Sequence, residues 1–254
     1  MGLTANEISL ILAGRTVLDG VSAQLERGRV TAILGPNGAG KTSLLRTLIG
    51  LTAPSSGTAM LDDQPIAAIP PAQRARRIGY LAQNAPLAWN VIARDVVALG
   101  RSPYRAPFAA AGADDRAAID AAIAATDLTR LADRPTGELS GGERARVMLA
   151  RVLAGTPEWL VADEPLASLD PAHQVDVLLR LRAVADAGSG VILVLHDLTH
   201  AARIADDIVL MRNGRVVAAG VAASVLTGDW LRQAYDIDFR IVETGRDRVI
   251  VPVR

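Results

Sequence analysis

Apolar residues fall into two kinds of strand pattern along this chain. Val21, Ala23 and Leu25 alternate with polar residues, which predicts a strand buried on one face, and Arg27-Gly28 then turns the chain. Other apolar runs are continuous, a pattern typical of strands covered on both faces of a sheet. The continuous runs, which predict the centre of the fold, are residues 30–34, 159–162 and 191–195.

The segments outside these runs predict helices and hairpins. Residues 41–49 favour a helix that Gly50 stops. Asn213-Gly214 lies between the apolar runs 208–211 and 216–219 and indicates a hairpin, and residues 239–242 and 249–251 predict a second one. Residues from about 86 to 156 are rich in alanine and arginine at helical spacing. We interpret them as a helical sub-domain inserted into a single domain that spans residues 1–254.

Composition and charge exclude some classes of function. The 254 residues include 27 basic and 27 acidic side chains, and a net charge of zero gives no support for non-specific nucleic-acid binding. The absence of cysteine excludes disulfides and thiolate metal sites. No stretch reaches the roughly 18–20 uncharged apolar residues that span a bilayer, and the first ten residues carry Glu7 and no basic cluster. We therefore expect a soluble chain whose membrane role, if any, depends on a partner.

A glycine-rich loop predicts phosphate binding. Residues 35–42 have the form G-x-x-x-x-G-K-[ST], between a predicted strand and a predicted helix, whereas a simple surface turn would not require that context. Glycines allow backbone N–H groups to approach phosphates, Lys41 places a cation between the β- and γ-phosphates, and the Thr42 hydroxyl can ligate Mg²⁺. The predicted ATP-binding residues of this loop are Gly35, Pro36, Asn37, Gly38, Ala39, Gly40, Lys41, Thr42 and Ser43.

Polar residues follow two of the apolar runs. Asp163-Glu164-Pro165 comes after residues 159–162, and His196 comes after residues 191–195. In isolation, adjacent carboxylates indicate a solvated loop and a lone histidine indicates a structural or exposed side chain. Because ligands bind at the carboxyl ends of the strands in open α/β sheets, we expect these positions to converge on one crevice.

Residues 139–143, Leu-Ser-Gly-Gly-Glu, predict a second anion site. Ser140 and Glu143 form a capping box, which predicts a helix from Glu143 to Ala154 closed by Gly155. The helix start also presents free N–H groups and a positive dipole end, although a capped helix alone would explain the pattern. A single phosphate cannot easily contact two helix N-termini of one compact monomer.

Together, the glycine loop, Leu-Ser-Gly-Gly-Glu and Asp163-Glu164-Pro165 resemble the ATP-binding subunit of an ATP-binding-cassette (ABC) transporter over almost the whole chain. The resemblance implies a phosphate-loop NTPase core of α/β class, with a mixed, mainly parallel sheet, an antiparallel β part and the inserted helical sub-domain. It implies that Glu164 is the general base and His196 contacts the γ-phosphate. Asp163 and Thr42 would hold Mg²⁺, and Gln83 would sense both Mg²⁺ and the attacking water. No role is implied for His173 or His200.

The resemblance also implies partners. In this family two copies pair head to tail, so that Ser140, Gly141 and Gly142 of one copy close on the ATP of the other. Residues 95–104 and 225–251 are similar to the ATPases of type II importers for ferric siderophores, haem and cobalamin. We therefore expect a membrane permease, indirectly a substrate-binding protein, no nucleic acid, and a peripheral position at the cytoplasmic face of the membrane. The permease would contact the groove from Gln83 to Tyr104, with Leu87, Trp89 and Val91 exposed.

Some alternatives stay open. A zinc or manganese importer and an exporter subunit are the nearest, because the cargo is selected by the permease and the binding protein. A soluble ABC ATPase usually carries two cassettes or long insertions, and a phosphate-loop kinase or GTPase lacks the Leu-Ser-Gly-Gly-Glu segment. The chain departs from the family at Leu12, where an aromatic residue usually stacks on adenine, so Leu12 or Val17 would pack against the base.

Overall fold

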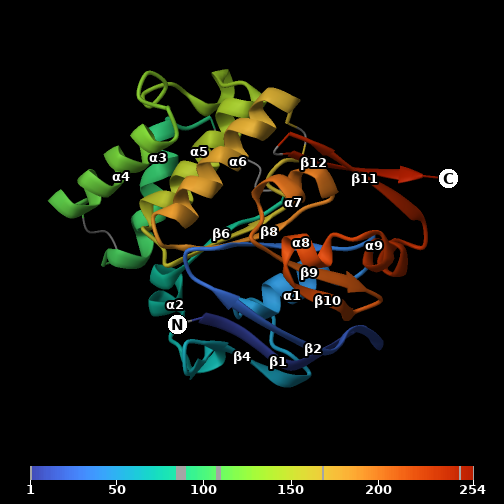
Figure 1. The fold of residues 1–254 in the computed structure, drawn as a ribbon. Helices are drawn as coiled ribbons and strands as arrows, with labels where there is room; N and C mark the ends of the chain where they lie inside the picture. Colours follow the sequence, from blue (N-terminus) through green and yellow to red (C-terminus); the bar gives the residue numbers. More distant parts are fainter. Residues whose placement is uncertain (1, 84–89, 107–109, 168, 246, 254) are drawn as a thin grey trace.

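A six-stranded sheet forms the centre of the computed structural model, which describes residues 2–83, 90–106, 110–167, 169–245 and 247–253 (Figure 1). Its order is β10-β9-β3-β8-β7-β6, with an antiparallel pair at the β10 edge and parallel pairs elsewhere. These strands are β3 (Val30–Leu34), β6 (Ile78–Leu81), β7 (Trp159–Asp163), β8 (Gly190–Val194), β9 (Asp207–Arg212) and β10 (Arg215–Val221). The predicted fold class, mixed and mainly parallel, is confirmed.

The continuous apolar runs occupy the middle of this sheet, as predicted. All five residues of β3, β7 and β8 are buried, because both sheet faces are covered. Alternate side chains along each strand enter different cores: Ile33 and Val194 point into one, Ala32 and Leu193 into the other. The predicted bounds shift by one residue, since Asp163 is the last residue of β7 and Leu195 lies beyond β8.

A second, antiparallel sheet covers one face and encloses helix α1 (Lys41–Leu48). The alternating run at residues 21–25 lies in this sheet, as predicted. The first strand of this sheet does not show a regular alternation of apolar and polar residues. Its pairing register shifts between Ala5 and Ile8, where Glu7 has a φ of 49°. The strands are β1 (Gly2–Leu12), β2 (Arg15–Glu26), β4 (Ser56–Leu61) and β5 (Gln64–Pro65).

Helices cover the other face of the central sheet (Figure 1). Within the described part of residues 86–156 the regular elements are helical, apart from an isolated bridge between Ile92 and Pro135, and their separation as a sub-domain stays a prediction. Helix α5 begins at Gly141, two residues before the predicted start, because Ser140 is the N-cap. Besides α1, the helices among the described residues are α2 (Pro71–Arg77), α3 (Ala93–Ala98), α4 (Ala113–Ala125), α5 (Gly141–Ala154), α6 (Pro171–Asp186), α7 (Leu198–Ile204), α8 (Ala222–Val225) and α9 (Gly228–Tyr235), with 3₁₀ turns η1 (Ile66–Ala68), η2 (Leu99–Tyr104) and η3 (Thr136–Glu138). Neither α2 nor η1 contributes to the core on this face.

Both predicted hairpins are present. Asn213 and Gly214, with φ of 51° and 77°, make the left-handed turn between β9 and β10. Strands β11 (Asp238–Thr244) and β12 (Asp247–Val253) pair near the C-terminus. This second hairpin is attached to α7, because the backbone N–H of Ile250 donates to Oγ1 of Thr199 at 3.1 Å.

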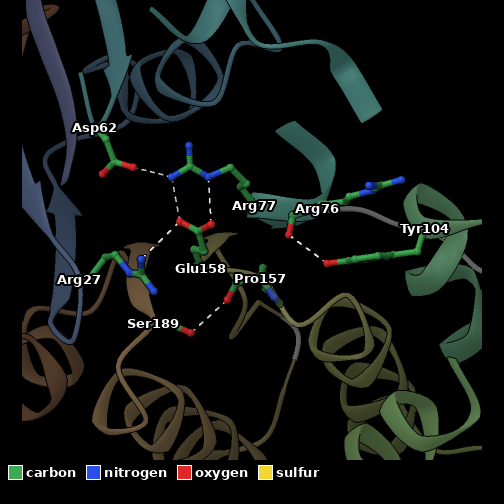
Figure 2. A network of polar contacts seen from close by, with 8 residues as sticks. All are labelled: Arg27, Asp62, Arg76, Arg77, Tyr104, Pro157, Glu158 and Ser189. Carbon is green, nitrogen blue, oxygen red and sulfur yellow. Dashed lines mark hydrogen bonds and ion pairs between the residues drawn. The ribbon is translucent and has the colours of Figure 1, made fainter. Parts of the chain in front are cut away.

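Ion pairs hold the elements together at the amino ends of β6 and β7 (Figure 2). Arg77 donates to Glu158 through Nε (3.0 Å) and Nη2 (2.8 Å), and Nη2 also lies 2.5 Å from Oδ2 of Asp62. Nη1 of Arg27 reaches the same Glu158 carboxylate at 3.4 Å. Four segments of the chain therefore meet at the amino-terminal ends of these parallel strands, opposite their carboxyl ends.

Tyr104 links η2 to the same region (Figure 2). Its hydroxyl donates to the carbonyl oxygen of Gly155 at 2.8 Å and lies 3.3 Å from that of Arg76. The guanidinium of Arg101 lies 3.7 Å from the ring centroid, and that of Arg76 lies 5.2 Å away. The ring is thus a packed connection between η2 and α2.

Candidate functional site

The glycine loop joins β3 to α1, and two of its glycines are required by backbone contacts. A Cβ on Gly35, which has a φ of 146°, would lie 2.2 Å from the carbonyl oxygen of Met211. Gly40 is the left-handed N-cap of α1, with a φ of 96°, and a Cβ there would lie 2.8 Å from the carbonyl oxygen of Val17. The loop therefore packs against neighbouring backbone atoms at Gly35 and Gly40, where only a residue without a Cβ fits.

Lys41 lies under this loop with 6% of its surface exposed. Its Nζ donates to the carbonyl oxygens of Gly35 (2.8 Å) and Pro36 (3.1 Å), and burial lowers the pKa of its ammonium group. A pocket of about 230 Å³ opens beside it, large enough for a phosphate group. The lining residues are Val17, Asn37, Gly38, Ala39, Gly40, Lys41, Thr42, Ser43, Glu164 and His196.

Asp163 lies at the end of β7, almost fully buried, beside the loop. Thr42 donates to Oδ1 of Asp163 at 2.9 Å, and the hydroxyl of Tyr80 lies 3.5 Å from Oδ2. Burial, together with the negative charge of Glu164, raises the pKa of the Asp163 carboxyl group. A hydroxyl and a carboxylate in contact are oxygen ligands that fit Mg²⁺, which binds few protein groups and keeps several waters. No group of three or more acidic or histidine ligands occurs within the described residues.

Glu164, Gln83 and His196 meet at the ends of three adjacent parallel strands. Nε2 of His196 lies 2.5 Å from Oε1 of Glu164, and Gln83 Nε2 donates to Oε2 of the same carboxylate. Glu164 has a φ of 51°, a conformation rarely adopted by side-chain-bearing residues, and its N–H donates to the carbonyl of Val194 at 3.2 Å. Glu164 and His196 both line the pocket beside Lys41, so the predicted convergence of these two strand ends on one crevice is observed, and Gln83 joins them through its contact with Glu164.

Ser140, Gly141 and Gly142 start helix α5 elsewhere in the molecule. The capping box has the predicted geometry: Glu143 N–H donates to Ser140 Oγ at 3.2 Å, and Ser140 N–H donates to Glu143 Oε2 at 2.7 Å. The second of these bonds lowers the pKa of the Glu143 carboxyl group. None of these residues belongs to the described lining of the pocket beside Lys41, so this chain presents two separate candidate anion sites.

The structure adds one residue, His173, to which the sequence had given no role. The ring of His173 lies against Gly142, where a Cβ would approach Cδ2 to 2.1 Å. Asp170 and His173 have the spacing of an N-cap and the third residue of a helix, but the sequence contains no signal for the contact with Gly142.

Other predicted positions give mixed results. Leu12 is 46% exposed and does not line the pocket, whereas Val17 does. Val91 is 36% exposed, in agreement with the prediction for the groove, and Tyr104 is half-buried, with the guanidinium groups of Arg76 and Arg101 near its ring. Leu87 and Trp89 lie outside the described residues. In the part of the chain that the structure covers, no helix combines the length and apolarity required to span a bilayer.

Comparison with known proteins gives consistent matches. Residues 18–167 match the family model described as ABC transporter. The chain is 42% identical to the hemin import ATP-binding protein HmuV of Thermobifida fusca, over 99% of this chain and 89% of that one. It is 41% identical to the cobalamin import ATP-binding protein BtuD of Halobacterium salinarum, over 93% of this chain but 59% of that longer protein.

Solved structures share the fold. The chain superposes on cbiO1 of Clostridium perfringens, part of the ABC transporter complex cbiONQ, with a TM-score of 0.80 and 29% identity over 91% of this chain and 92% of that one. A chain described as a metal-chelate type ABC transporter, in an inward-facing conformation, gives a TM-score of 0.87 at 24% identity, over 100% of this chain and 98% of that one. The resemblance inferred from the three motifs is confirmed: the chain belongs to the ABC transporter family, as one of its ATP-binding subunits.

Proposed function

We propose that this protein is the ATPase subunit of an ABC importer and hydrolyses ATP in a head-to-tail dimer to drive uptake through a partner permease. The observation that carries the proposal is the contact of Glu164 with both Gln83 and His196 beside the pocket that contains Lys41. A carboxylate held by two polar side chains next to a phosphate-binding lysine has the geometry of a general base for phosphoryl transfer.

Each side chain has a part in this reaction. Glu164 accepts a proton from the water that attacks the γ-phosphate, and His196 and Gln83 fix the orientation of the carboxylate and of that water. Lys41 exchanges its bonds to the loop carbonyls for bonds to the β- and γ-phosphates. When bound, Mg²⁺ would be held by Thr42 and Asp163 and would neutralise charge on the phosphates.

The separation of the two anion sites supports the proposed dimer. Ser140, Gly141 and Gly142 present a capped helix N-terminus away from the pocket beside Lys41, so they are suited to the nucleotide of a second copy. A related solved structure, that of the bacterial ABC transporter cassette MJ0796, is dimeric and 25% identical to this chain. We propose the same pairing here, at the cytoplasmic face of the membrane.

For the cargo, we propose haem, a related iron chelate or cobalamin. Several relatives about 40% identical to this chain are named as hemin import proteins, and others are named as cobalamin import proteins. A substrate-binding protein would deliver the cargo to the permease. Zinc and manganese importers and exporters remain the alternative within the family.

The permease surface is proposed to be the groove between α2–β6 and η2–α5. A cavity of about 200 Å³ lies there, lined by residues that include Tyr80, Leu99 and Arg151. Leu99 is 59% exposed at its rim, and Val91 is exposed nearby in sequence. Apolar side chains exposed beside a groove are typical of protein contact sites.

Reconstitution tests the function. The chain and a candidate permease from the same organism would be placed in liposomes with ATP and Mg²⁺, and uptake of haem, a ferric siderophore, cobalamin and Zn²⁺ would be compared. We expect ATP-dependent uptake of one of the first three and none with Lys41→Ala. Uptake of Zn²⁺ alone would favour the alternative, and an ATPase activity stimulated by ribosomes rather than the permease would contradict an importer.

Cross-linking tests the docking surface. The chain has no native cysteine, so single cysteines at Val91 and Leu99 can be joined to the permease by a thiol cross-linker. Leu179 on α6, which is 65% exposed, is the matched control position. Cross-links at residue 179 but at neither residue 91 nor residue 99 would place the permease elsewhere.

A further inference from the structure

The imidazole of His173 fills the space beside Gly142. A Cβ on Gly142 would lie 2.1 Å from Cδ2 and 2.4 Å from Nε2 of His173, which is closer than side chains pack. Gly142 is buried, whereas nothing lies within 4 Å of a Cβ built on Gly141. The ring therefore packs directly on the backbone at the start of α5.

Asp170 fixes this ring. Oδ2 of Asp170 lies 2.7 Å from Nδ1 of His173, and Oδ1 accepts the backbone N–H of the same residue at 3.0 Å. These bonds lower the pKa of the Asp170 carboxyl group, first the backbone bond and then the ring bond. The carboxylate caps α6 and, through Nδ1, orients the imidazole toward Gly142.

The contact between His173 and Gly142 also involves the segment that follows the proposed base, Glu164. Residues 164–167 form a turn before Asp170, because Ala167 N–H donates to the carbonyl of Glu164 at 3.2 Å. Gln174, one residue after His173, donates to the carbonyl of Leu166 at 3.4 Å. His173 thus connects the segment that follows the base with the start of α5.

We infer that His173 is a positioning residue that holds the signature segment, Ser140 to Gly142, in fixed relation to the Glu164 segment of the same chain. The inference rests on the proposed function, in which the signature segment of one copy closes on the nucleotide of the other. Loss of the ring would leave nucleotide binding to the glycine loop intact and would weaken the closed dimer.

A second histidine provides a matched control. His200 is also the third residue of a helix whose N-cap is an aspartate, and Oδ1 of Asp197 accepts its N–H at 2.9 Å. It starts α7, on a different element from the one that packs on Gly142. His200→Ala therefore removes a histidine from the same capped position without touching the signature segment.

ATP-dependent dimerisation of the full chain carrying Glu164→Gln is the test. His173→Ala should weaken the ATP-bound dimer by about 10- to 100-fold, the loss expected from a small misplacement of a binding group. Its affinity for a fluorescent ATP analogue, measured at protein concentrations where the chain is monomeric, should stay within about twofold. His200→Ala should change neither quantity. His173→Gln, whose amide extends over the same space, should restore part of the dimerisation.

A double-mutant cycle tests the contact itself. Gly142→Ala should lower the melting temperature of the nucleotide-free chain, and should lower it less when His173→Ala is also present, because the ring no longer occupies the space. Additive effects would show that the contact is absent and would overturn the inference.

The remaining outcomes are also decisive. Wild-type dimerisation of His173→Ala, or an equal loss of nucleotide affinity, would overturn the inference and leave the proposed function intact. If the Glu164→Gln parent itself does not dimerise with ATP, the proposed function fails and this inference fails with it.

Discussion

The hydroxyl of Thr42 donates a 2.9 Å hydrogen bond to Oδ1 of Asp163, which connects the first turn of α1 to the last residue of β7. Asp163 is almost fully buried and its pKa is raised, chiefly by burial. The carboxylate therefore destabilises the nucleotide-free fold at neutral pH, and its place beside Thr42 is explained by the charge of the cation it would meet there.

Asp163→Asn should stabilise the nucleotide-free protein at pH 7. The pKa of the Asp163 carboxyl group is higher in the folded chain than in the unfolded chain, where it is about 3.9. At a pH above the folded pKa the carboxylate is charged and opposes folding, whereas at a pH below the unfolded pKa it is neutral in both states and this destabilisation vanishes. The gain in melting temperature should therefore be largest at neutral pH and should shrink as the pH falls toward 4. Thermal unfolding between pH 5 and 8, without Mg²⁺, measures it, with the exposed Asp120→Asn as control. A melting temperature at pH 7 equal to or below that of wild type would contradict this account.

Glu164→Gln should lower the rate of ATP hydrolysis by about 10²- to 10⁴-fold, the usual loss for a general base, while ATP binding is retained. The amide keeps the shape of the side chain but cannot accept the proton of the attacking water. Steady-state phosphate release and nucleotide binding give the two numbers. Glu138→Gln, at an exposed position that pairs with Arg134, is the control. Hydrolysis by Glu164→Gln at the wild-type rate would remove Glu164 from the proposed role.

ATP and GTP should bind with affinities that differ by less than about tenfold, or about 1.4 kcal/mol. Leu12 stands where a stacking ring is expected, and it is exposed and outside the phosphate pocket. Phosphate contacts then supply most of the binding energy, and these are common to both nucleotides. Competition binding measures the ratio, and Leu12→Tyr should increase the affinity for both. A much larger preference for ATP would show that another group recognises the base.

Arg77→Lys should destabilise the fold by about 1–3 kcal/mol, because an ammonium group cannot replace the two parallel hydrogen bonds to Glu158 and the bond to Asp62. Denaturation by urea measures the loss. Arg94→Lys, which alters an exposed pair with Asp120, should cost less than about 1 kcal/mol. The rate of ATP hydrolysis per folded molecule should be unchanged in both variants. A lower rate in Arg77→Lys alone would mean that the ion pairs of Arg77 also affect the ATP-binding site.

The parts of the fold that depend on local pattern were predictable from the sequence. The buried strand Val30–Leu34 and the Asn213-Gly214 turn each follow from a few neighbouring residues. Strand β1 was not predicted, because the bulge at Glu7 interrupts its alternation. In the site, residue identities came from motifs, but the contact of Gln83 with Glu164 joins residues 81 positions apart, and only the order of the strands brings them together.

A Cβ added at Gly35 would meet a backbone atom, whereas a Cβ added at Gly142 would meet a side chain, and this difference has a genetic consequence. At Gly35 the obstructing atom is the carbonyl oxygen of residue 211, which every amino acid possesses, so no substitution at that position can suppress Gly35→Ala. At Gly142 the obstacle is a side chain, that of His173, which a single codon change can shrink. A selection that reports folding of the chain, rather than its ATPase activity, should therefore recover changes at residue 173 for alanine at position 142, and none at residue 211 for alanine at position 35.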